Sequence, residues 1–267
     1  MYHPHNPRLF QWAAGVELAT NYGKSKDIFF LDLFVSSKIG PVEFMAGQRK
    51  NTIGLLDSAL TSGSLAMAGN ARPFPRFQIS IPEFLPLGFT NDLIAVKANY
   101  SDGRFGKSGI LYGSVSSVPV TYFHQKSLYI RIGHTKSKIQ LFGGINHQAI
   151  WGGEAKILPI YDLKPPKAYW YTITGKTLDY RKIGFHFGTI DLGIKWRKNE
   201  WSYFLYRQNI YETGSLFRII NFSDGLNGVK ITRNKQSNNQ KNNFVINSVL
   251  FEVVNTQNQT NHLFLTA

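Results

Sequence analysis

The chain has 267 residues, of which 43% are hydrophobic, and no run approaches the roughly 18 apolar residues of a membrane-spanning helix. It has no cysteine, which excludes disulfides, thiolate metal ligands and a cysteine nucleophile. The formal net charge of +14 favours an anionic partner, but the basic residues are scattered and do not single out nucleic acid.

Segments that alternate between apolar and polar residues occur along the whole chain. Successive residues of a strand point to opposite faces of a sheet, so each segment predicts a strand with one apolar and one polar face. Together they predict roughly ten to thirteen strands, at the spacing of a barrel or a sandwich. The clearest of them are residues 9–20, 29–35, 42–47, 76–81, 93–100, 127–133, 138–147, 182–197, 201–210 and 244–254.

Several segments depart from this alternation. Residues 48–75 predict an ordered loop with a short helix near residues 53–59, and long loops of this kind are usually functional. Residues 152–180 are rich in Gly, Pro and Tyr and predict mostly loop. The apolar phase of the strand after them changes near Gly188, which predicts a β-bulge. The Asn- and Gln-rich residues 233–243 predict a solvent-exposed loop.

The two central strands favour a membrane barrel over a sandwich with a sealed core. In residues 127–133 the apolar residues share one phase, and polar or small residues hold the other. Residues 138–147 repeat the pattern, with Phe142 as an exception in the polar phase. Aromatic residues make up 14% of the chain, which fits the aromatic girdles of a membrane barrel and a sandwich core built on Phe about equally. The predicted fold class is all-β: an antiparallel transmembrane β-barrel, or a contiguous part of one, with residues 48–75 as a plug-like loop.

Six short motifs carry a resemblance to a known family. They are GNARPFP at residues 69–75, HQKSLY at 124–129, GGINHQ at 143–148, WGGE at 151–154, DGL at 224–226 and NTQNQ at 255–259. In these residues, and over about residues 42–262, the chain resembles the Wzi family of capsule assembly proteins, in the form common among Bacteroidetes-type sequences.

The resemblance implies an outer-membrane β-barrel with a partly plugged lumen. It implies a protein, not an enzyme, that assembles capsule or exopolysaccharide by retaining it at the cell surface through lectin-like, non-covalent binding. The expected partners are an acidic capsular or extracellular polysaccharide and outer-membrane lipid or lipopolysaccharide, with no nucleic acid and no cofactor. Relative to the family, residues 1–267 are expected to be a single but incomplete barrel domain. It would lack the N-terminal signal or first segment and the C-terminal strands, and would insert poorly alone.

The candidate polysaccharide-binding residues combine aromatic, amide and charged side chains. Sugar rings stack on aromatic faces, while amides and carboxylates pair with hydroxyl groups. The competing explanation is that these side chains bond to neighbouring loops and hold a plug in place. The candidates are Asn70, Arg72, His124, Lys126, Arg131, Asn146, His147, Gln148, Trp151 and Glu154. Arg181, Lys195 and Arg207 extend the set of basic residues that would suit an acidic glycan.

Other functions remain open from the sequence. Glu83, Glu154, Asp162 and Asp191 supply carboxylates for a β-rich glycan-active enzyme, a glycoside hydrolase or lyase, although their separation is not given by sequence. A metal site is disfavoured, because the spacing of the histidines and carboxylates matches no chelating motif. A soluble nucleic-acid-binding domain is disfavoured because aromatic residues share phases with aliphatic ones.

Overall fold

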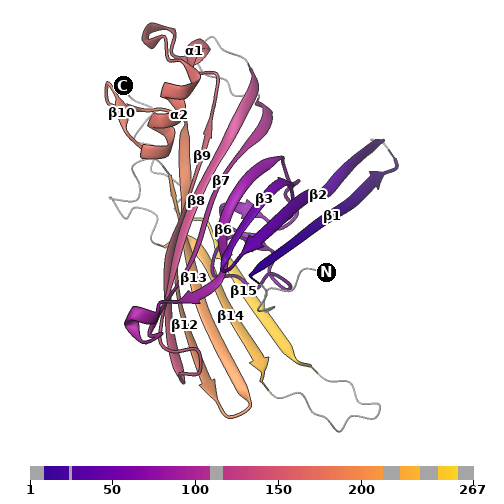
Figure 1. Ribbon diagram of the computed structural model, residues 1–267, viewed down its shortest axis with the longest axis vertical. Helices are drawn as coiled ribbons and strands as arrows, with labels where there is room; N and C mark the ends of the chain where they lie inside the picture. The colour runs from indigo at the N-terminus through magenta and orange to yellow at the C-terminus, as the bar shows by residue number, and fades with distance from the viewer. Residues whose placement is uncertain (1–8, 24–25, 109–116, 213–222, 235–245, 258–267) are drawn as a thin grey trace.

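The computed structural model describes residues 9–23, 26–108, 117–212, 223–234 and 246–257, and it contains one large antiparallel sheet of eleven strands (Figure 1). Each strand pairs with the neighbouring strand along the chain, in the order β1-β2-β3-β6-β7-β8-β9-β12-β13-β14-β15. The strands are β1 (Phe10–Asn21), β2 (Asp27–Ile39), β3 (Val42–Gln48), β6 (Arg76–Pro86), β7 (Ile94–Ser108), β8 (Val118–Ile132), β9 (Ile139–Trp151), β12 (Phe185–Lys198), β13 (Trp201–Glu212), β14 (Gly225–Arg233) and β15 (Ser248–Asn255).

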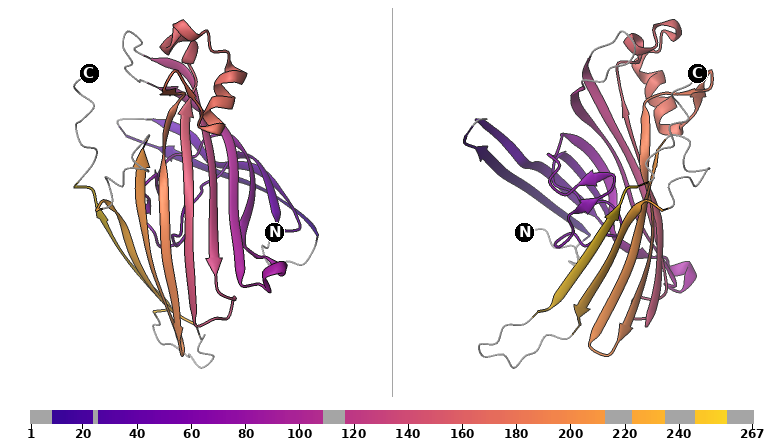
Figure 2. Two further views of the ribbon diagram at one scale, coloured as in Figure 1. Left: turned by 90° about the vertical axis from the view of Figure 1, so that its left-hand side faces the viewer. Right: turned by 180° about the vertical axis from the view of Figure 1, so that it is seen from behind.

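The sheet is strongly curved, with a convex and a concave face (Figure 2). Within the described residues β1 and β15 do not pair with each other, so the sheet is not closed. An up-and-down antiparallel sheet of long, curved strands is the fold of a transmembrane β-barrel, here as a contiguous part of one. The predicted fold class is confirmed, and the eleven strands of the main sheet in the described residues fall within the predicted ten to thirteen.

Apolar side chains cover the middle of the convex face. Ile194 of β12 lies beside Leu141 of β9 and Leu205 of β13, and these three side chains are 40%, 48% and 46% exposed. The adjacent concave-facing side chains are polar and buried. Asp191 and Gln208 pair across β12 and β13 and are both 0% exposed. A soluble protein has the reverse arrangement, so this convex surface fits a surrounding of lipid.

We call this surface the apolar belt. On β12 it extends from Ile190 to Trp196, about 20 Å along the strand. Trp196 and Trp201 lie at its lower rim beside Tyr203, as in the aromatic girdle of a membrane barrel. Besides these aromatic residues, the belt contains the exposed side chains of Leu128, Ile130, Ile132, Ile139, Leu141, Ile145, Leu192, Ile194, Leu205, Val229 and Phe251.

Two segments outside the sheet cover parts of its two faces. Residues 49–75, the plug segment, lie against the concave face and contain β4 (Gly63–Ser64) and β5 (Met67–Ala68). Residues 154–182, the helical insertion, lie on the convex face above the belt. The insertion contains α1 (Glu154–Ile157), η2 (Pro159–Tyr161), α2 (Pro165–Thr174), β10 (Thr177–Leu178) and β11 (Arg181–Lys182), and η1 (Gly88–Thr90) lies in the β6–β7 turn. No helix in the described part of the chain is long and apolar enough to cross a membrane.

Three local predictions were wrong. Residues 53–59 form no helix, because the Asp57 carboxylate accepts hydrogen bonds from the N–H groups of Ala59 and Leu60 and closes a turn instead. The register of β12 is unbroken at Gly188, so the predicted bulge is absent. Residues 152–180 contain two α-helices rather than mostly loop. The predicted Asn- and Gln-rich loop falls largely on residues 235–245, outside the described residues.

Candidate functional site

Buried polar residues of β12 and β13 hold the start of the plug segment. The Leu55 N–H donates to Asp191 Oδ2 at 2.9 Å, and Gln208 Nε2 donates to the same oxygen at 2.7 Å. The backbone passes close to both side chains, since a Cβ on Gly54 would lie 2.0 Å from Gln208 Nε2. Only glycine fits there, at a φ of +109°. The carboxylate of Asp191 therefore fixes the position of the plug on the concave face.

Further along, the plug segment is held by β14 and β15. The Glu252 carboxylate accepts hydrogen bonds from the Thr61 hydroxyl at 2.8 Å and from the Ser62 N–H at 3.1 Å. Asp57 forms an ion pair with Lys230. Burial alone would raise the pKa of the Asp57 carboxyl, but the hydrogen bonds from Lys230 and from the backbone outweigh it and lower that pKa. Asp57 is therefore ionised at neutral pH, and the ion pair persists.

Residues 49 and 50, at the N-terminal end of the plug segment, are held by β1, β3 and β6. Arg49 pairs with the buried carboxylate of Glu43 at 2.7 Å, and Arg76 donates to the Arg49 carbonyl at 2.9 Å. Lys50 pairs with Glu17 of β1 at 2.9 Å. The plug segment therefore bridges strands that are far apart in the sheet.

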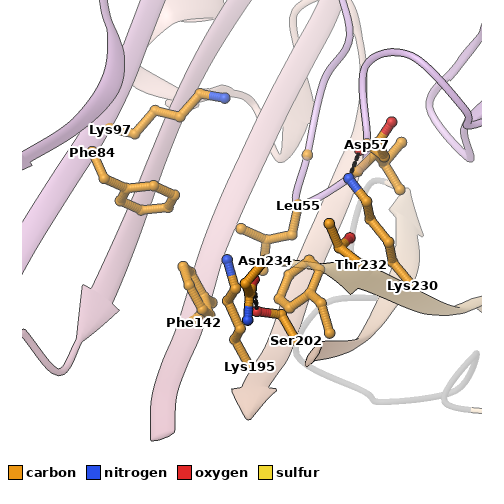
Figure 3. A pocket seen from close by; sticks show the side chains of 13 residues that line it. Leu55, Asp57, Phe84, Lys97, Phe142, Lys195, Ser202, Lys230, Thr232 and Asn234 are labelled. Atoms are coloured by element: carbon orange, nitrogen blue, oxygen red, sulfur yellow. Dashed lines mark hydrogen bonds and ion pairs between the residues drawn. The ribbon is translucent and has the colours of Figure 1, made fainter. Parts of the chain in front are cut away.

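A pocket of about 330 Å³ lies between the plug segment and the lower part of the concave face (Figure 3). One wall is aromatic: Phe142 of β9 packs edge-on against Phe84 and Phe204, with ring centroids 5.4 and 5.3 Å apart. A polar wall from β13 and β14 contains Ser202, whose hydroxyl donates to Asn234 Oδ1 at 2.6 Å. The remaining lining residues are Gly54, Leu55, Leu56, Asp57, Lys97, Lys195, Lys230 and Thr232.

The pocket has an excess of positive charge. Lys97, Lys195 and Lys230 line it, whereas Asp57 is its one carboxylate and already pairs with Lys230. Lys97 and Lys195 have no ion-pair partner among the residues that the structure describes. Aromatic side chains beside unpaired ammonium groups and hydroxyls suit a ligand with an apolar ring face and negatively charged substituents.

A polar cluster lies on the convex face above the apolar belt, beneath α2. His124 Nδ1 lies 2.9 Å from Asp102 Oδ1, and the Tyr169 hydroxyl of α2 donates to Asp102 Oδ2 at 2.7 Å. His147 Nε2 lies 2.9 Å from His186 Nδ1. The insertion therefore separates polar side chains of the strands from lipid. The apolar phase of β12 changes near Gly188 because the outward face of the strand passes there from the apolar belt into the zone that the insertion covers.

The contacts of α2 with β7 also change the pKa of Tyr169, a residue of α2. The Tyr169 hydroxyl contacts both Asp102 and the Tyr100 hydroxyl, the latter at 2.8 Å. Burial and these two contacts raise the pKa of the Tyr169 phenol. The phenol therefore stays protonated at neutral pH and remains a hydrogen-bond donor to Asp102.

No three His, Cys, Asp or Glu side chains of the described residues come close enough to hold a metal ion.

The ten predicted binding residues do not form one site. His124, Lys126, His147 and Trp151 lie on the convex face, and Glu154 begins α1, where it accepts a hydrogen bond from the Gly152 N–H at 2.7 Å. Arg131, Asn146 and Gln148 lie on the concave face. Asn70 and Arg72 belong to the plug segment, and Arg72 pairs with Asp27 at 3.2 Å. Strand alternation explains the separation, because His147 and its neighbours Asn146 and Gln148 must point to opposite faces.

The sequence reasoning missed most of the pocket. Of its lining residues, Lys195 was named among the basic residues, whereas Phe84, Phe142, Lys97 and Lys230 were not assigned a role. One signal was present: Phe142 breaks the polar phase of its strand, and it does so because it forms the aromatic wall of the pocket. Phe84, Lys97 and Lys230 come from β6, β7 and β14, and no local motif joins them into one site.

Comparisons with known proteins add little to this geometry. No family model and no curated protein sequence matches the chain. Two solved structures resemble it, both of OmpT, an outer membrane protein of Vibrio cholerae. The form lacking loop L8 is 9% identical over 77% of this chain and 68% of that chain, with a TM-score of 0.37. The in-vitro folded form is 9% identical over 85% and 69% of the two chains, with a TM-score of 0.34.

One expectation from the sequence is corrected here, the statement that the chain is not an enzyme. The solved structures that resemble the chain are OmpT proteins, and this likeness gives no support for excluding catalysis.

The faces of the sheet give the location of the chain. A sheet with an apolar convex belt, an aromatic rim and a polar concave face is the arrangement of the transmembrane barrels of outer membranes. The chain is an outer-membrane protein.

Proposed function

We propose that this outer-membrane protein takes part in capsule or exopolysaccharide assembly by binding an acidic polysaccharide non-covalently, in the manner of a lectin. This is the role implied by its resemblance to the Wzi family. The pocket beneath the plug segment, rather than the ten residues chosen from sequence, is the proposed binding site.

The observation that carries this proposal is the pair of unpaired lysines beside an aromatic wall. Lys97 and Lys195 line the same pocket as Phe84 and Phe142, and neither forms an ion pair within the described residues; Glu83, outside the pocket lining, acts on Lys97 only at longer range. Carboxylate or phosphate groups of an acidic glycan would supply charge-assisted hydrogen bonds to these ammonium groups. Sugar rings would stack on the phenylalanines. A neutral polysaccharide would use the aromatic wall but leave both lysines without a partner.

Replacing Lys97 or Lys195 with glutamine should therefore weaken binding of an acidic polysaccharide. We expect each single substitution to reduce affinity by about tenfold, and the double variant by about 100-fold, because a hydrogen bond to a charged group contributes about 1.5–3 kcal/mol. Binding of polygalacturonate to the detergent-solubilised full chain, followed by calorimetry, measures the effect. The same experiment records whether the polysaccharide is cleaved.

The matched control is Lys136→Gln, which removes one exposed lysine from the β8–β9 turn, outside the lining of the pocket. It should leave the affinity unchanged. Binding of neutral dextran should be weak in all forms. Equal binding of polygalacturonate by the double variant and the unmodified chain would rule out the pocket as the acidic-glycan site.

A further inference from the structure

The helical insertion has a surface chemistry unlike the rest of the convex face. Of its charged side chains, Glu154 is buried and bonded to the backbone, while Asp162 and Asp179 are exposed. Its basic side chains outnumber these carboxylates and are all exposed. They are Lys156, Lys164, Lys167, Lys176, Arg181 and Lys182. Within the described residues none of the six forms an ion pair.

Large apolar side chains lie among these cations and are also exposed. Trp170 of α2 is 54% exposed, Ile160 of η2 is 91% exposed and Tyr180 between β10 and β11 is 100% exposed. In α2 the residues Ala168 and Thr172 are buried against the sheet. Residues three apart lie on the same side of a helix, so Lys167 and Trp170 share the opposite, outward-facing side. A surface that combines cations with exposed Trp, Tyr and Ile is typical of protein at a membrane–water interface.

The position of the insertion matches this chemistry. The Lys126 ammonium donates to the Ile173 carbonyl at 2.6 Å, and Tyr169 bonds to Asp102, so α2 is fixed on the convex face. Lys126 and His147 pair across β8 and β9 directly above Leu128 and Ile145, which belong to the apolar belt. The insertion therefore begins where the belt ends, at the depth of the lipid headgroups.

Connection lengths indicate which leaflet this is. At the end of the sheet away from the insertion, four connections are short, residues 40–41, 87–93, 133–138 and 199–200, and the β14–β15 connection, residues 234–247, is longer. At the insertion's end, the β1–β2 connection, residues 22–26, is short, whereas residues 49–75 and 152–184 form the two longest connections of the sheet. In outer-membrane barrels the short turns face the periplasm and the long loops face the outside. The insertion thus lies at the outer leaflet.

We propose that the helical insertion is a binding surface for the phosphate groups of an outer-leaflet glycolipid, with Lys164, Lys167 and Lys176 contacting phosphate and Trp170 lying among the upper acyl chains. The charge is complementary, and the exposed apolar side chains favour a lipid over a soluble glycan. This surface is separate from the pocket on the concave face, so the two proposals stand or fall independently.

Native mass spectrometry of the detergent-solubilised full chain, titrated with bis-phosphorylated lipid A, tests this proposal. We expect lipid A to bind, and the same lipid after removal of its phosphates to bind at least tenfold more weakly. The triple variant Lys164→Gln, Lys167→Gln, Lys176→Gln should lose at least tenfold in affinity for bis-phosphorylated lipid A. The matching Lys→Arg triple variant should retain binding, because it keeps the charges.

A control variant carries Lys136→Gln, Lys138→Gln and Lys198→Gln at the opposite end of the strands. It should bind lipid A like the unmodified chain, and circular dichroism should show the same β-content for every variant. Equal lipid A affinity of the insertion variant and the unmodified chain, or equal binding of the dephosphorylated lipid, would overturn the proposal. Competition of millimolar inorganic phosphate with lipid A would also overturn it, by assigning the surface to free phosphate. An insertion variant that lost polygalacturonate binding but kept lipid A binding would overturn it too, by assigning the surface to the polysaccharide.

Discussion

Replacing Ile194 with arginine is expected to destabilise the folded chain in a lipid bilayer by about 2–4 kcal/mol, the cost of a charge near the middle of a lipid-facing barrel surface. Ile194 points outward from β12 with Leu141 and Leu205 as its neighbours on the adjacent strands. An arginine there would lie between Leu141 and Leu205 and must displace lipid to reach water. Urea-dependent folding into phospholipid vesicles, followed by tryptophan fluorescence, measures the change in the free energy of unfolding.

The matched control is Ala155→Arg, which places the same charge on an exposed position of α1 outside the belt. Its effect should stay within about 0.5 kcal/mol, as for most surface substitutions. If the two variants were equally stable, the convex face near Ile194 would not be in contact with lipid.

Replacing Asp191 with alanine is expected to release the plug segment. The Asp191 carboxylate accepts the hydrogen bonds of both the Leu55 N–H and the Gln208 amide in a fully buried setting. Each donor left without an acceptor costs about 1–3 kcal/mol. The variant should have a lower free energy of unfolding, and trypsin should cleave within residues 49–75 faster than in the unmodified chain.

Asp27→Ala provides the comparison, because Asp27 also holds the plug segment, through its ion pair with Arg72. Both side chains of that pair are about half exposed, at 47% and 54%. Exposed pairs contribute about 0–1 kcal/mol, so plug cleavage in this variant should rise little. Cleavage that increased equally in both variants would show that Asp191 has no special part in holding the plug.

The order and faces of the strands could be predicted from the sequence because alternation reports directly on which side chains point outward. Leu128, Ile130 and Ile132 share one phase in the sequence and one face in the structure. The prediction failed where a second element covers that face. His186 and Gly188 are on the same face of β12 as Ile190, but His186 is buried in the zone that the insertion covers, and a single strand's periodicity contains no information about what covers it.

The candidate site was less predictable for a related reason. Its lysines come from β7, β12 and β14, and its aromatic wall comes from β6, β9 and β13, so no local motif joins them. The motif at residues 143–148 suggested a binding site built from adjacent residues. Adjacent residues of a strand point to opposite faces, however, and cannot line the same cavity. The plug segment was predicted by its lack of alternation. The residues that hold it, Asp191 and Glu252, form contacts over more than a hundred positions of sequence.

The central claim, that the apolar face of the strands lies in lipid and the polar face around a wet interior, has a direct test. The chain has no cysteine, so single spin labels can be attached at Ile194→Cys and Lys195→Cys, neighbouring positions on opposite faces of β12. In bilayers, the account predicts that the label at 194 relaxes faster with oxygen, which dissolves in lipid, and the label at 195 with a water-soluble nickel chelate. Equal access of the nickel chelate to both labels, or the reverse preference, would contradict it.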